Sequence, residues 1–537
     1  MAILDLSVAG PDLNETASFC VVGAGIAGLL LATRLARRKR KVIVLESGNM
    51  RFDPAVHALN EIDDPAQRYS RSLNGRYRGL GGSSSRWGGR MIPISPSDSQ
   101  ARQHIAQPEW PINQHVLDGY ERELEKLFSV GHDPFDEIDI ISNGMSGLLS
   151  TDEEDFKVRW AKCPTFKRCN IATMLGDELR SSLHASVWLN ATVSDFGLDR
   201  AAGRLVTLKA QSLAERRIAV SADQFVIAAG TIESTRLLLL LNEASDRHAF
   251  AGTDALGRYF QDHLKAEVAQ VDRQRPALTN HLLSYRFVKG TRRDLHLELS
   301  CGAQESEAVS SAFVYVSMDL ANSGLAAIKG IAHGLQQRKV ELRQVGAAMK
   351  DLRLVARGAF WRLWHKQLYV PPGVPFRLMT SIEQLPHAQN RITLSHTRDR
   401  LGMPKARLDW KPRASDERTF RATAQRLKHY WQRSGFDSLC PLVWDPAVAD
   451  PHAYITDKAE ACAHPSGSIR MGTDPATSVV GPDLRCHGVP NVAVASAAIF
   501  PTAGSANPTF TIMKLALWLA DSYQNVPFRG FNAVLPA

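Results

Sequence analysis

The sequence has few of the features that mark secreted, metal-binding or membrane-spanning proteins. Cysteine is scarce: the chain of 537 residues contains seven, an odd number with irregular spacing. They are Cys20, Cys163, Cys169, Cys301, Cys440, Cys462 and Cys486. This scatter indicates neither a disulfide framework nor a zinc site, and no metal is expected. The apolar run at residues 19–32 is too short to cross a bilayer and is rich in glycine.

A secretory signal is also missing. Residues 1–18 carry Asp5, Asp12 and Glu15 but no basic segment, so we expect a cytoplasmic protein. The formal net charge of +9 permits weak attraction to anionic surfaces, but no nucleic-acid-binding motif accompanies it. A nucleic-acid partner is therefore not expected.

The overall composition is that of an ordinary soluble globular protein, with 44% hydrophobic and 22% charged residues. Neither an internal repeat nor a low-complexity tract is present. Because 537 residues are too many for one simple core, we expect two interleaved domains.

The first informative motif is a glycine turn between two apolar strand patterns. Residues 19–22 predict a strand, residues 23–28 read Gly-Ala-Gly-Ile-Ala-Gly, residues 29–38 predict a helix, and residues 41–45 predict a strand that ends at Glu46. Such glycines make a tight turn, admit a pyrophosphate to the backbone and let the helix pack on the strand. The helix N-terminus can bind phosphates, and the acid can bind the ribose hydroxyls. An acid here disfavours a 2′-phosphate, so the motif predicts FAD or NAD rather than NADP.

A second motif follows at residues 79–89, which read Gly-Leu-Gly-Gly-Ser-Ser-Ser-Arg-Trp-Gly-Gly. Five glycines around one tryptophan do not form a core strand. The composition is typical of a loop whose backbone approaches a flat, polar ligand closely. A flexible linker is the alternative, but Trp87 and the neighbouring Arg78 and Arg90 are unlike linker composition.

The third motif lies near the C-terminus. Residues 462–472 place His464 in a loop rich in proline, glycine and serine, residues 492–501 contain a buried-strand pattern, and residues 506–509 read Ala-Asn-Pro-Thr before a helical pattern. An imidazole can take a hydroxyl proton near neutral pH, and a fixed asparagine can hold the same oxygen. Asn507, with Pro508 in the first turn, is predicted to cap the helix that runs through Ala520.

Together these segments resemble the glucose–methanol–choline (GMC) family of FAD-dependent oxidoreductases. The resemblance covers nearly the whole chain, because further family markers are found at intervals between the three motifs. These are Trp110-Pro111-Ile112 with Tyr120, the segments 225–238 and 256–263, and residues 390–404.

The resemblance implies an α/β fold in which a Rossmann-like FAD-binding domain is interleaved with an α+β substrate domain built on an antiparallel sheet. Residues 15–95, 185–270 and 455–537 would form the discontinuous FAD-binding domain. Residues 96–184 and 271–454 would form the substrate-binding domain, with a basic amphipathic helical insertion near residues 325–368.

The resemblance also implies the residues that bind FAD. They are Gly23, Gly25, Ile26, Ala27, Gly28, Glu46, Gly82, Ser83, Ser84, Trp87, Gly88, Val193, Gly230, Ser496, Ala497, Asn507, Pro508 and Thr509. Some relatives attach FAD covalently through a histidine before the loop tryptophan; Arg86 stands there, which implies non-covalent FAD. The family usually has an acid at Ser496, so this contact with the cofactor is expected to be weaker.

By resemblance, His464 is the catalytic base and Asn507 its partner on the substrate oxygen. His263, His387 and His487 are competing histidines. The reaction implied is oxidation of an alcohol to a carbonyl by hydride transfer to flavin N5. A sugar, glycoside or polyol is favoured, because polar residues are many and aromatic residues make up 7%. The alternatives are a choline-like, sterol or aryl alcohol, or a flavin monooxygenase or amine oxidase that shares only the FAD domain. The electron acceptor stays open between O2, a quinone and a carrier protein.

Residues 328–368 have an unusual pattern. Apolar residues spaced by three and four define one helix face: Leu342, Val345, Met349, Leu352, Ala356, Ala359 and Leu363. Five basic residues occupy other positions, and three aromatic residues cluster near the end. The pattern predicts either a helix that covers the substrate domain with a solvated basic side, or a surface helix that contacts a membrane or an anionic glycan.

Overall fold

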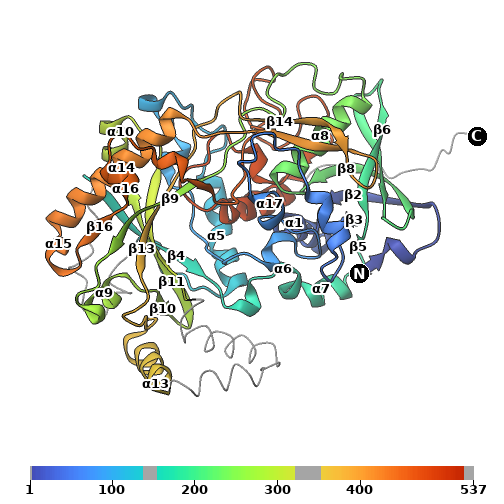
Figure 1. Cartoon of the computed structure of the whole chain (residues 1–537). Coiled ribbons are helices and arrows are strands. Elements are labelled where there is room, and N and C mark those ends of the chain that lie inside the picture. Colours follow the sequence, from blue (N-terminus) through green and yellow to red (C-terminus); the bar gives the residue numbers. More distant parts are fainter. Residues whose placement is uncertain (1–2, 137–153, 321–351, 525–537) are drawn as a thin grey trace, which may run out of the picture.

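The computed structural model describes residues 3–136, 154–320 and 352–524. Two large sheets organise it, one on each side of a central group of helices (Figure 1). The first sheet contains, in order, β1 (Ile3–Asp5), β5 (Ala185–Leu189), β3 (Val42–Leu45), β2 (Leu13–Val22), β8 (Arg217–Ile227), β7 (Arg204–Gln211) and β6 (Thr192–Asp199), and β18 (Val492–Val494) pairs with β8. The pairs β1–β5, β5–β3, β3–β2, β2–β8 and β8–β18 are parallel.

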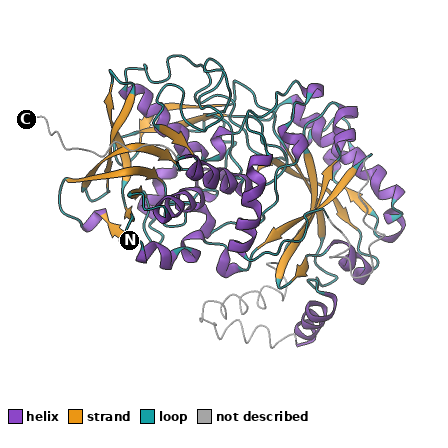
Figure 2. Ribbon diagram, turned by 180° about the vertical axis from the view of Figure 1, so that it is seen from behind, coloured by secondary structure: helices purple, strands orange, loops and turns teal. Residues whose placement is uncertain are grey.

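The second sheet is antiparallel and lies on the opposite side of the molecule (Figure 2). Its order is β10 (Arg286–Val288), β11 (Thr291–Leu299), β12 (Ala312–Met318), β13 (Phe376–Ile382), β9 (Leu264–Val271) and β16 (Leu442–Trp444), while β4 (Phe156–Cys163) pairs with β11 and β17 (Glu460–Ala461) with β9. A separate hairpin consists of β14 (Arg391–Arg398) and β15 (Pro404–Asp409). The predicted α/β fold with a Rossmann-like sheet and an antiparallel sheet is confirmed.

Within the described ranges, five helices of twelve or more residues support the two sheets: α1 (Ile26–Arg37), α5 (His115–Phe128), α8 (Thr231–Ala244), α14 (Ala414–Arg433) and α17 (Thr509–Ser522). Shorter helices include α6 (Ile171–Met174), α7 (Gly176–Ser181), α9 (Pro276–Leu283), α10 (Cys301–Glu307), α15 (Phe436–Leu439) and α16 (Pro446–Ala449). Helix α1 packs on β3 and α17, and α14 covers β12 and β13. No helix in the described ranges has both the length and the apolar character needed to cross a bilayer.

The two ends of the chain are joined in the core of the first sheet. β18, from the last part of the described chain, and β2, from the first part, both pair in parallel with β8. Arg34 on α1 donates two hydrogen bonds of 2.8 Å to the carboxylate of Asp521 on α17, and the Tyr120 hydroxyl donates to the same carboxylate at 3.0 Å. A forked, charge-assisted pair of this kind fixes the relative positions of α1, α5 and α17.

Alternation along the strands gives the second sheet an apolar face and a charged face. On β11, Leu295, Leu297 and Leu299 belong to the core that also contains Phe420 and Leu427 of α14. The residues between them and before them point to the other face, because side chains alternate along a strand. That second face carries Arg292, Asp294, His296 and Glu298.

Two predicted domain boundaries differ from the structure. The boundary at residue 270 falls inside the second sheet, because β9 pairs with β13 through residues 264–271. The FAD-binding domain was predicted to begin at residue 15, but β1 already pairs with β5 of the first sheet. β5 and β6 are separated at Asn190, whose φ is +55°.

The helical insertion near residues 325–368 lies partly outside the described residues, and so do Leu342, Val345 and Met349. The described part contains α13 (Leu352–Phe360) and a π-helical turn (Trp361–His365). The predicted apolar face does not turn inward there: Leu352, Ala356, Ala359 and Leu363 are exposed, and Leu354 and Trp361 are buried instead.

Candidate active site

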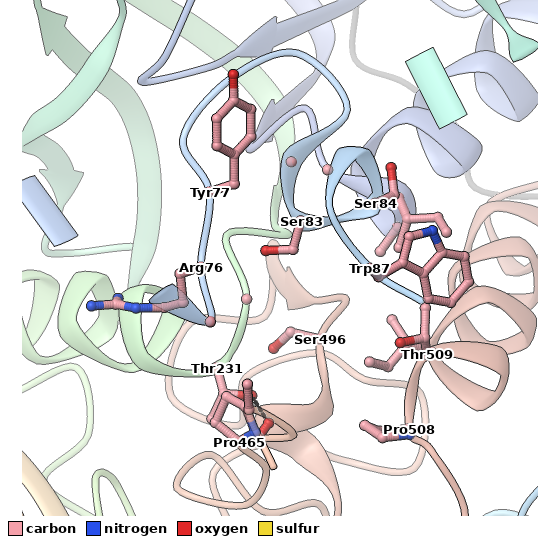
Figure 3. A pocket seen from close by; sticks show the side chains of 18 of the residues that line it. Arg76, Tyr77, Ser83, Ser84, Trp87, Thr231, Pro465, Ser496, Pro508 and Thr509 are labelled. Carbon is pink, nitrogen blue, oxygen red and sulfur yellow. Dashed lines mark hydrogen bonds between the residues drawn. The ribbon is translucent and has the colours of Figure 1, made fainter. Parts of the chain in front are cut away.

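A cavity of about 710 Å³ is lined by residues from both sheets and from both ends of the chain. Residues 22–27 contribute from the N-terminal end, residues 82–88 from the glycine loop, and residues 507–509 with Ile512 from the C-terminal end. Figure 3 shows Ser83, Ser496 and Thr509 arranged around the same opening, with Trp87 beside Thr509.

Most of the residues predicted to bind the cofactor line this cavity. The lining includes Gly23, Gly25, Ile26, Ala27, Glu46, Gly82, Ser83, Ser84, Trp87, Gly88, Val193, Gly230, Ser496, Asn507, Pro508 and Thr509. Gly28 and Ala497 do not line it. Both belong to the surrounding framework: Gly28 packs against the backbone of Gly23, and the Ala497 carbonyl accepts the N–H of Gly467.

The glycine turn has the geometry that the sequence predicts. Gly23 has φ of +104°, which a side chain would disfavour, and a Cβ added to Gly28 would lie 2.0 Å from the carbonyl oxygen of Gly23. A Cβ added to Gly25 would meet nothing within 4 Å, so this residue exposes its backbone to open space. The N-cap of α1 is Gly25, which has no side-chain capping bond, so the first N–H groups of the helix stay available for a ligand.

Glu46 is held rigidly at one end of the cavity. Its carboxylate accepts hydrogen bonds from the backbone N–H groups of Ala24 (2.7 Å), Gly48 (2.8 Å) and Gly79 (3.0 Å). Burial raises its pKa, while these amides and the charge of Arg78 act in the opposite direction. Each carboxylate oxygen has two acceptor positions, and three of the four are occupied, so one position on Oε2 remains for a hydroxyl group.

The glycine loop approaches α1 closely. It contains a 3-10 turn (Gly82–Ser85), and a Cβ added to Gly82 would lie 2.8 Å from the Cα of Gly25. The indole N–H of Trp87 donates to the carbonyl of Cys169 at 2.8 Å. This loop is therefore an ordered part of the cavity wall, not a flexible linker.

At the other end of the cavity, His464 is flanked by a histidine and an asparagine. Its Nδ1 lies 3.0 Å from Nδ1 of His263, and its Nε2 lies 3.0 Å from Nδ2 of Asn507. His263 extends this row of hydrogen bonds, since its Nε2 lies 2.8 Å from the carbonyl oxygen of Gly504. Of the competing histidines, His263 thus joins the site, whereas His387 and His487 do not line the cavity.

The hydrogen-bond partners determine which nitrogen of each imidazole carries the proton. A carbonyl only accepts, so Nε2 of His263 carries the proton, and the neutral ring then has an acceptor at Nδ1. His464 must therefore donate from Nδ1, which leaves Nε2 without a proton. Asn507 Nδ2 donates to that free lone pair. The arrangement presents His464 Nε2, beside Asn507, as a proton acceptor at the cavity.

Electrostatics keep both rings neutral. Burial lowers the pKa of His263 to about 4. Burial also lowers the pKa of His464 well below its usual value, and any charge on His263 and the positive fields of Arg90 and Lys265 would act in the same direction. A neutral imidazole at pH 7 is the form that can accept a proton.

Strand pairing brings the two histidines together. β17 pairs with the beginning of β9, and the Cys462 N–H donates to the carbonyl of His263 at 2.9 Å. The carboxylate of Asp262 accepts the backbone N–H of His464 (2.9 Å) and the hydroxyl of Tyr69 (2.7 Å). Two chain segments that lie 201 residues apart in the sequence are thus held side by side at His464.

The role predicted for Asn507 as a helix cap is wrong. The N-cap of α17 is Pro508, and no side chain caps this helix. Instead, the Asn507 amide donates to His464, and its Oδ1 is buried without a partner among the described residues. Helix α17 therefore begins after Pro508 without a hydrogen bond from the Asn507 side chain.

Several cavity residues were not expected from the sequence. At the Glu46 end they include Asn60 and Arg76, which lie near Arg78. At the His464 end they are Lys265, Tyr285, Arg292, Phe313, Tyr315 and Ser381. The strand period signals two faces for each of these strands, but it does not say which face meets the cavity.

The residues present fit a dinucleotide cofactor such as FAD. Three helices, α1, α8 and α17, begin at the cavity with Gly25, Gly230 and Pro508 as N-caps, none of which makes a side-chain capping bond. Their free N–H groups suit an anionic or polar ligand. The Glu46 carboxylate and the unpartnered Oδ1 of Asn507 add acceptors. The cavity thus has the donors and acceptors that ribose hydroxyls, a pyrophosphate and a flavin ring require.

Comparison with known proteins finds one family profile near each end of the chain. Residues 386–516 match the family profile described as GMC oxidoreductase, and residues 21–51 match that of an NAD(P)-binding Rossmann-like domain. Over 142 residues the chain is 33% identical to paromamine 6′-oxidase of Streptomyces fradiae, covering 26% of this chain and 24% of the relative.

A longer match of 320 residues relates the chain to the fructose dehydrogenase large subunit of Gluconobacter japonicus, with 25% identity over 57% of this chain and 48% of the relative. The chain thus spans less than half the length of these curated relatives. Among solved structures, pyridoxine 4-oxidase from Mesorbium loti shares the fold, with a TM-score of 0.55 and 18% identity over 94% of this chain and 99% of that one.

Proposed function

Because the chain belongs to the glucose–methanol–choline oxidoreductase family, we propose that it oxidises an alcohol to a carbonyl compound with FAD as cofactor. The observation that carries the proposal is the unprotonated Nε2 of His464, which lies beside Asn507 at a cavity that fits FAD. When bound, FAD supplies the hydride acceptor.

The chain's own residues would divide the work of holding the cofactor. The N-terminus of α1, behind the glycine turn, would bind the pyrophosphate, and Glu46 would bind a ribose hydroxyl. We propose that the FAD is not covalently attached. Arg86 stands where some relatives have the attaching histidine, and its guanidinium lies over the rings of Phe52 and Tyr77, 4.9 and 4.5 Å from the ring centroids.

In the proposed reaction His464 Nε2 takes the hydroxyl proton of the substrate while a hydride leaves the same carbon. Asn507 cannot relay a proton, so its role is to hold the substrate oxygen. His263 does not touch the cavity; it positions the base, because its Nδ1 accepts the Nδ1 proton of His464. An imidazole held in this tautomer needs no reorganisation before it accepts the proton.

We propose a sugar, glycoside or polyol as the substrate. The names of the relatives support this class, since paromamine 6′-oxidase and fructose dehydrogenase are named for carbohydrate substrates. Choline-like, sterol and aryl alcohols are the alternatives. A flavin monooxygenase or amine oxidase is less consistent with the family match at residues 386–516, which contains both His464 and Asn507. The electron acceptor would be O2, a quinone or a carrier protein.

Replacement of His464 tests this function. We expect His464→Ala to retain FAD and to reduce it roughly two to four decades more slowly under anaerobic conditions with a panel of sugars and polyols. His387→Ala, outside the cavity, is the matched control. Wild-type flavin reduction by the His464 variant, or bleaching of the wild type by amines and by no alcohol, would contradict the proposal.

We also propose a cytoplasmic protein that touches membrane surfaces weakly through α13 and the turn after it. The side chains of Leu363 and Trp364 are 70% and 75% exposed, and the exposed cations Arg353, Arg357 and Lys366 flank them. Exposed apolar residues among cations suit an anionic lipid surface. In a flotation assay with phosphatidylglycerol vesicles at low salt, the protein should therefore move to the top of the gradient with the vesicles. A Leu363→Ala/Trp364→Ala variant should remain at the bottom, whereas the control Val443→Ala should float like the wild type. Failure of the wild type to float would contradict the proposed membrane contact.

A further inference from the structure

The floor of the cavity at the His464 end is the charged face of the antiparallel sheet. Strand register places Phe313, Ser381 and Lys265 in one row across β12, β13 and β9, and all three line the cavity. Arg292, on the same face of β11, lines it as well. A sheet that buries its apolar side against α14 thus presents polar groups to the substrate end.

Positive charge exceeds negative charge at this end. The cations are Arg90, Arg292 and Lys265. A single buried carboxylate, Asp294, accepts from both guanidinium groups, at 2.6 Å from Arg90 and 2.7 Å from Arg292. Three charged groups thus leave one net positive charge at this point, before Lys265 is counted.

Lys265 is only weakly neutralised. Its ammonium lies 3.6 Å from the carboxylate of Glu460, which is 60% exposed and is also paired with Arg71 at 2.9 Å. An exposed carboxylate shared between two cations offsets little of the charge on either.

Acidic residues of the cavity lie at its other end. Among the described residues that line it, the carboxylates are Glu46, which is bound by backbone amides, and Glu233, which is paired with Arg78 at 2.9 Å. Neither neutralises the cations beside His464.

Hydroxyl donors stand among these cations. Tyr285 and Tyr315 line the cavity, and neither hydroxyl makes a hydrogen bond within the described residues. Arg292 lies over the ring of Tyr285 at 4.8 Å and Arg90 over that of Tyr315 at 5.1 Å, which fixes the rings and guanidinium groups relative to one another. The Nε and Nη2 groups of Arg292 face Asp294, so its Nη1 group is left for a ligand. A guanidinium N–H beside hydroxyl donors suits a carboxylate.

The cationic end adjoins the base. Lys265, the second residue of β9, follows His263 by two residues. Ser381 Oγ lies 3.7 Å from Sγ of Cys462, which is two residues before His464. The positive fields of Arg90 and Lys265 also reach the His464 ring, whose pKa they lower. An anionic group bound here would place a hydroxyl on a nearby carbon within reach of the base.

We propose that the alcohol substrate carries a carboxylate, bound by Arg292 and Lys265 with the hydroxyls of Tyr285 and Tyr315. The substrate class is then a sugar acid or polyol acid, not a neutral or amine-bearing sugar. This inference rests on the proposed alcohol oxidation, but the binding site for the carboxylate can be tested separately from it.

Two sets of substrates with matched skeletons test the charge preference. D-gluconate, D-glucitol and D-glucamine share one open chain and end in a carboxylate, a hydroxymethyl and an aminomethyl group; methyl α-D-glucuronoside, methyl α-D-glucoside and its 6-amino-6-deoxy analogue are the ring counterparts. We expect kcat/KM for anaerobic flavin reduction to be roughly 100-fold higher for the acid than for the neutral member in at least one set, with the amine lowest. A neutral or amine-bearing member that is preferred in both sets overturns the inference.

Equilibrium binding gives a readout that needs no turnover. Adipate, a six-carbon dicarboxylate without a hydroxyl group, should bind the flavin-loaded protein in calorimetry, and more weakly as salt rises. Arg292→Met and Lys265→Met should each weaken adipate roughly tenfold or more. Asp294 keeps its pair with Arg90 in the first variant, and the second removes a partly exposed ammonium, so both should fold. The controls are Arg377→Met and Lys405→Met, whose side chains lie on strands but outside the cavity.

The outcomes separate the two proposals. Adipate binding that depends on Arg292 and Lys265, in a protein that no alcohol reduces, supports the carboxylate site and contradicts the alcohol oxidation. Flavin reduction by glucitol with no detectable adipate binding overturns the carboxylate site and leaves the oxidation intact. Adipate binding that both variants retain at full strength also overturns the inference.

Discussion

The proton arrangement at His464 depends on a residue that never meets the substrate, and His263→Phe would expose that dependence. Phenylalanine fills the space of the imidazole ring but removes the acceptor at Nδ1 and the donor at Nε2. His464 then has a buried Nδ1–H without a partner, and the carbonyl of Gly504 loses its donor. The alternative tautomer, with the proton on Nε2, becomes competitive, and in that form the base nitrogen cannot accept a proton.

The size of the effect follows from the bond that is lost. An unpaired buried donor costs about 1–3 kcal/mol, which shifts the tautomer equilibrium by that amount. At about 1.4 kcal/mol for each tenfold change, the fraction of productive base falls roughly 5- to 150-fold. We expect kcat for flavin reduction to fall by the same factor. KM should change little, because His263 does not line the cavity.

Stopped-flow reduction of the bound flavin under anaerobic conditions measures both parameters. His387→Phe, a substitution outside the cavity, is the matched control, and the flavin content and melting temperature of each variant show whether the fold is intact. A His263→Phe enzyme with full flavin content and wild-type kcat would refute the tautomer argument. A rise in KM without a fall in kcat would refute it equally, since it would mean that His263 acts on substrate binding.

Three further predictions concern the base, the glycine turn and the cofactor linkage. Burial, with nearby positive charges, lowers the pKa of His464, so kcat/KM for flavin reduction should keep its plateau below pH 6.5 and fall only as the base is protonated at lower pH; a half-maximal point at or above pH 6.5 contradicts this. Lys265→Met should move this limb to higher pH, because it removes one of those charges. Gly28→Ala places a Cβ 2.0 Å from a backbone oxygen, so we expect a loss of roughly 1–3 kcal/mol in stability and a lower flavin-to-protein ratio; Gly252→Ala, with nothing within 4 Å of its Cβ, should match the wild type, and an unchanged Gly28 variant would contradict the packing argument. Acid precipitation should release all flavin absorbance into the supernatant, because Arg86 occupies the attachment position; flavin retained in the pellet would mean that it is covalently bound.

The sequence predicts well where one local pattern determines the outcome. The glycine turn at residues 23–28 requires a strand before it and a helix after it, and β2, α1 and β3 are found there. The buried-strand pattern at residues 492–501 likewise predicts a strand, and β18 is found at its beginning. In both places the geometry depends on residues that are neighbours in the chain.

The prediction fails where distant segments compete for one group. Asn507 has the local sequence of a helix cap, but His464, 43 residues earlier, takes its amide. His263 looks like any other histidine until β17 pairs with β9 and brings it beside the base. Likewise, the helical period at residues 352–363 identifies an apolar face but not the direction in which tertiary packing turns it.

The joining of the chain ends has a consequence for biosynthesis. The ribosome makes the glycine turn long before β18 and α17, which are the last elements of the cavity to emerge. Until residue 509 has been made, a nascent chain therefore has only part of the cofactor-binding cavity and cannot retain the cofactor. Premature stops before residue 509 should give protein without flavin, however well the earlier segments fold.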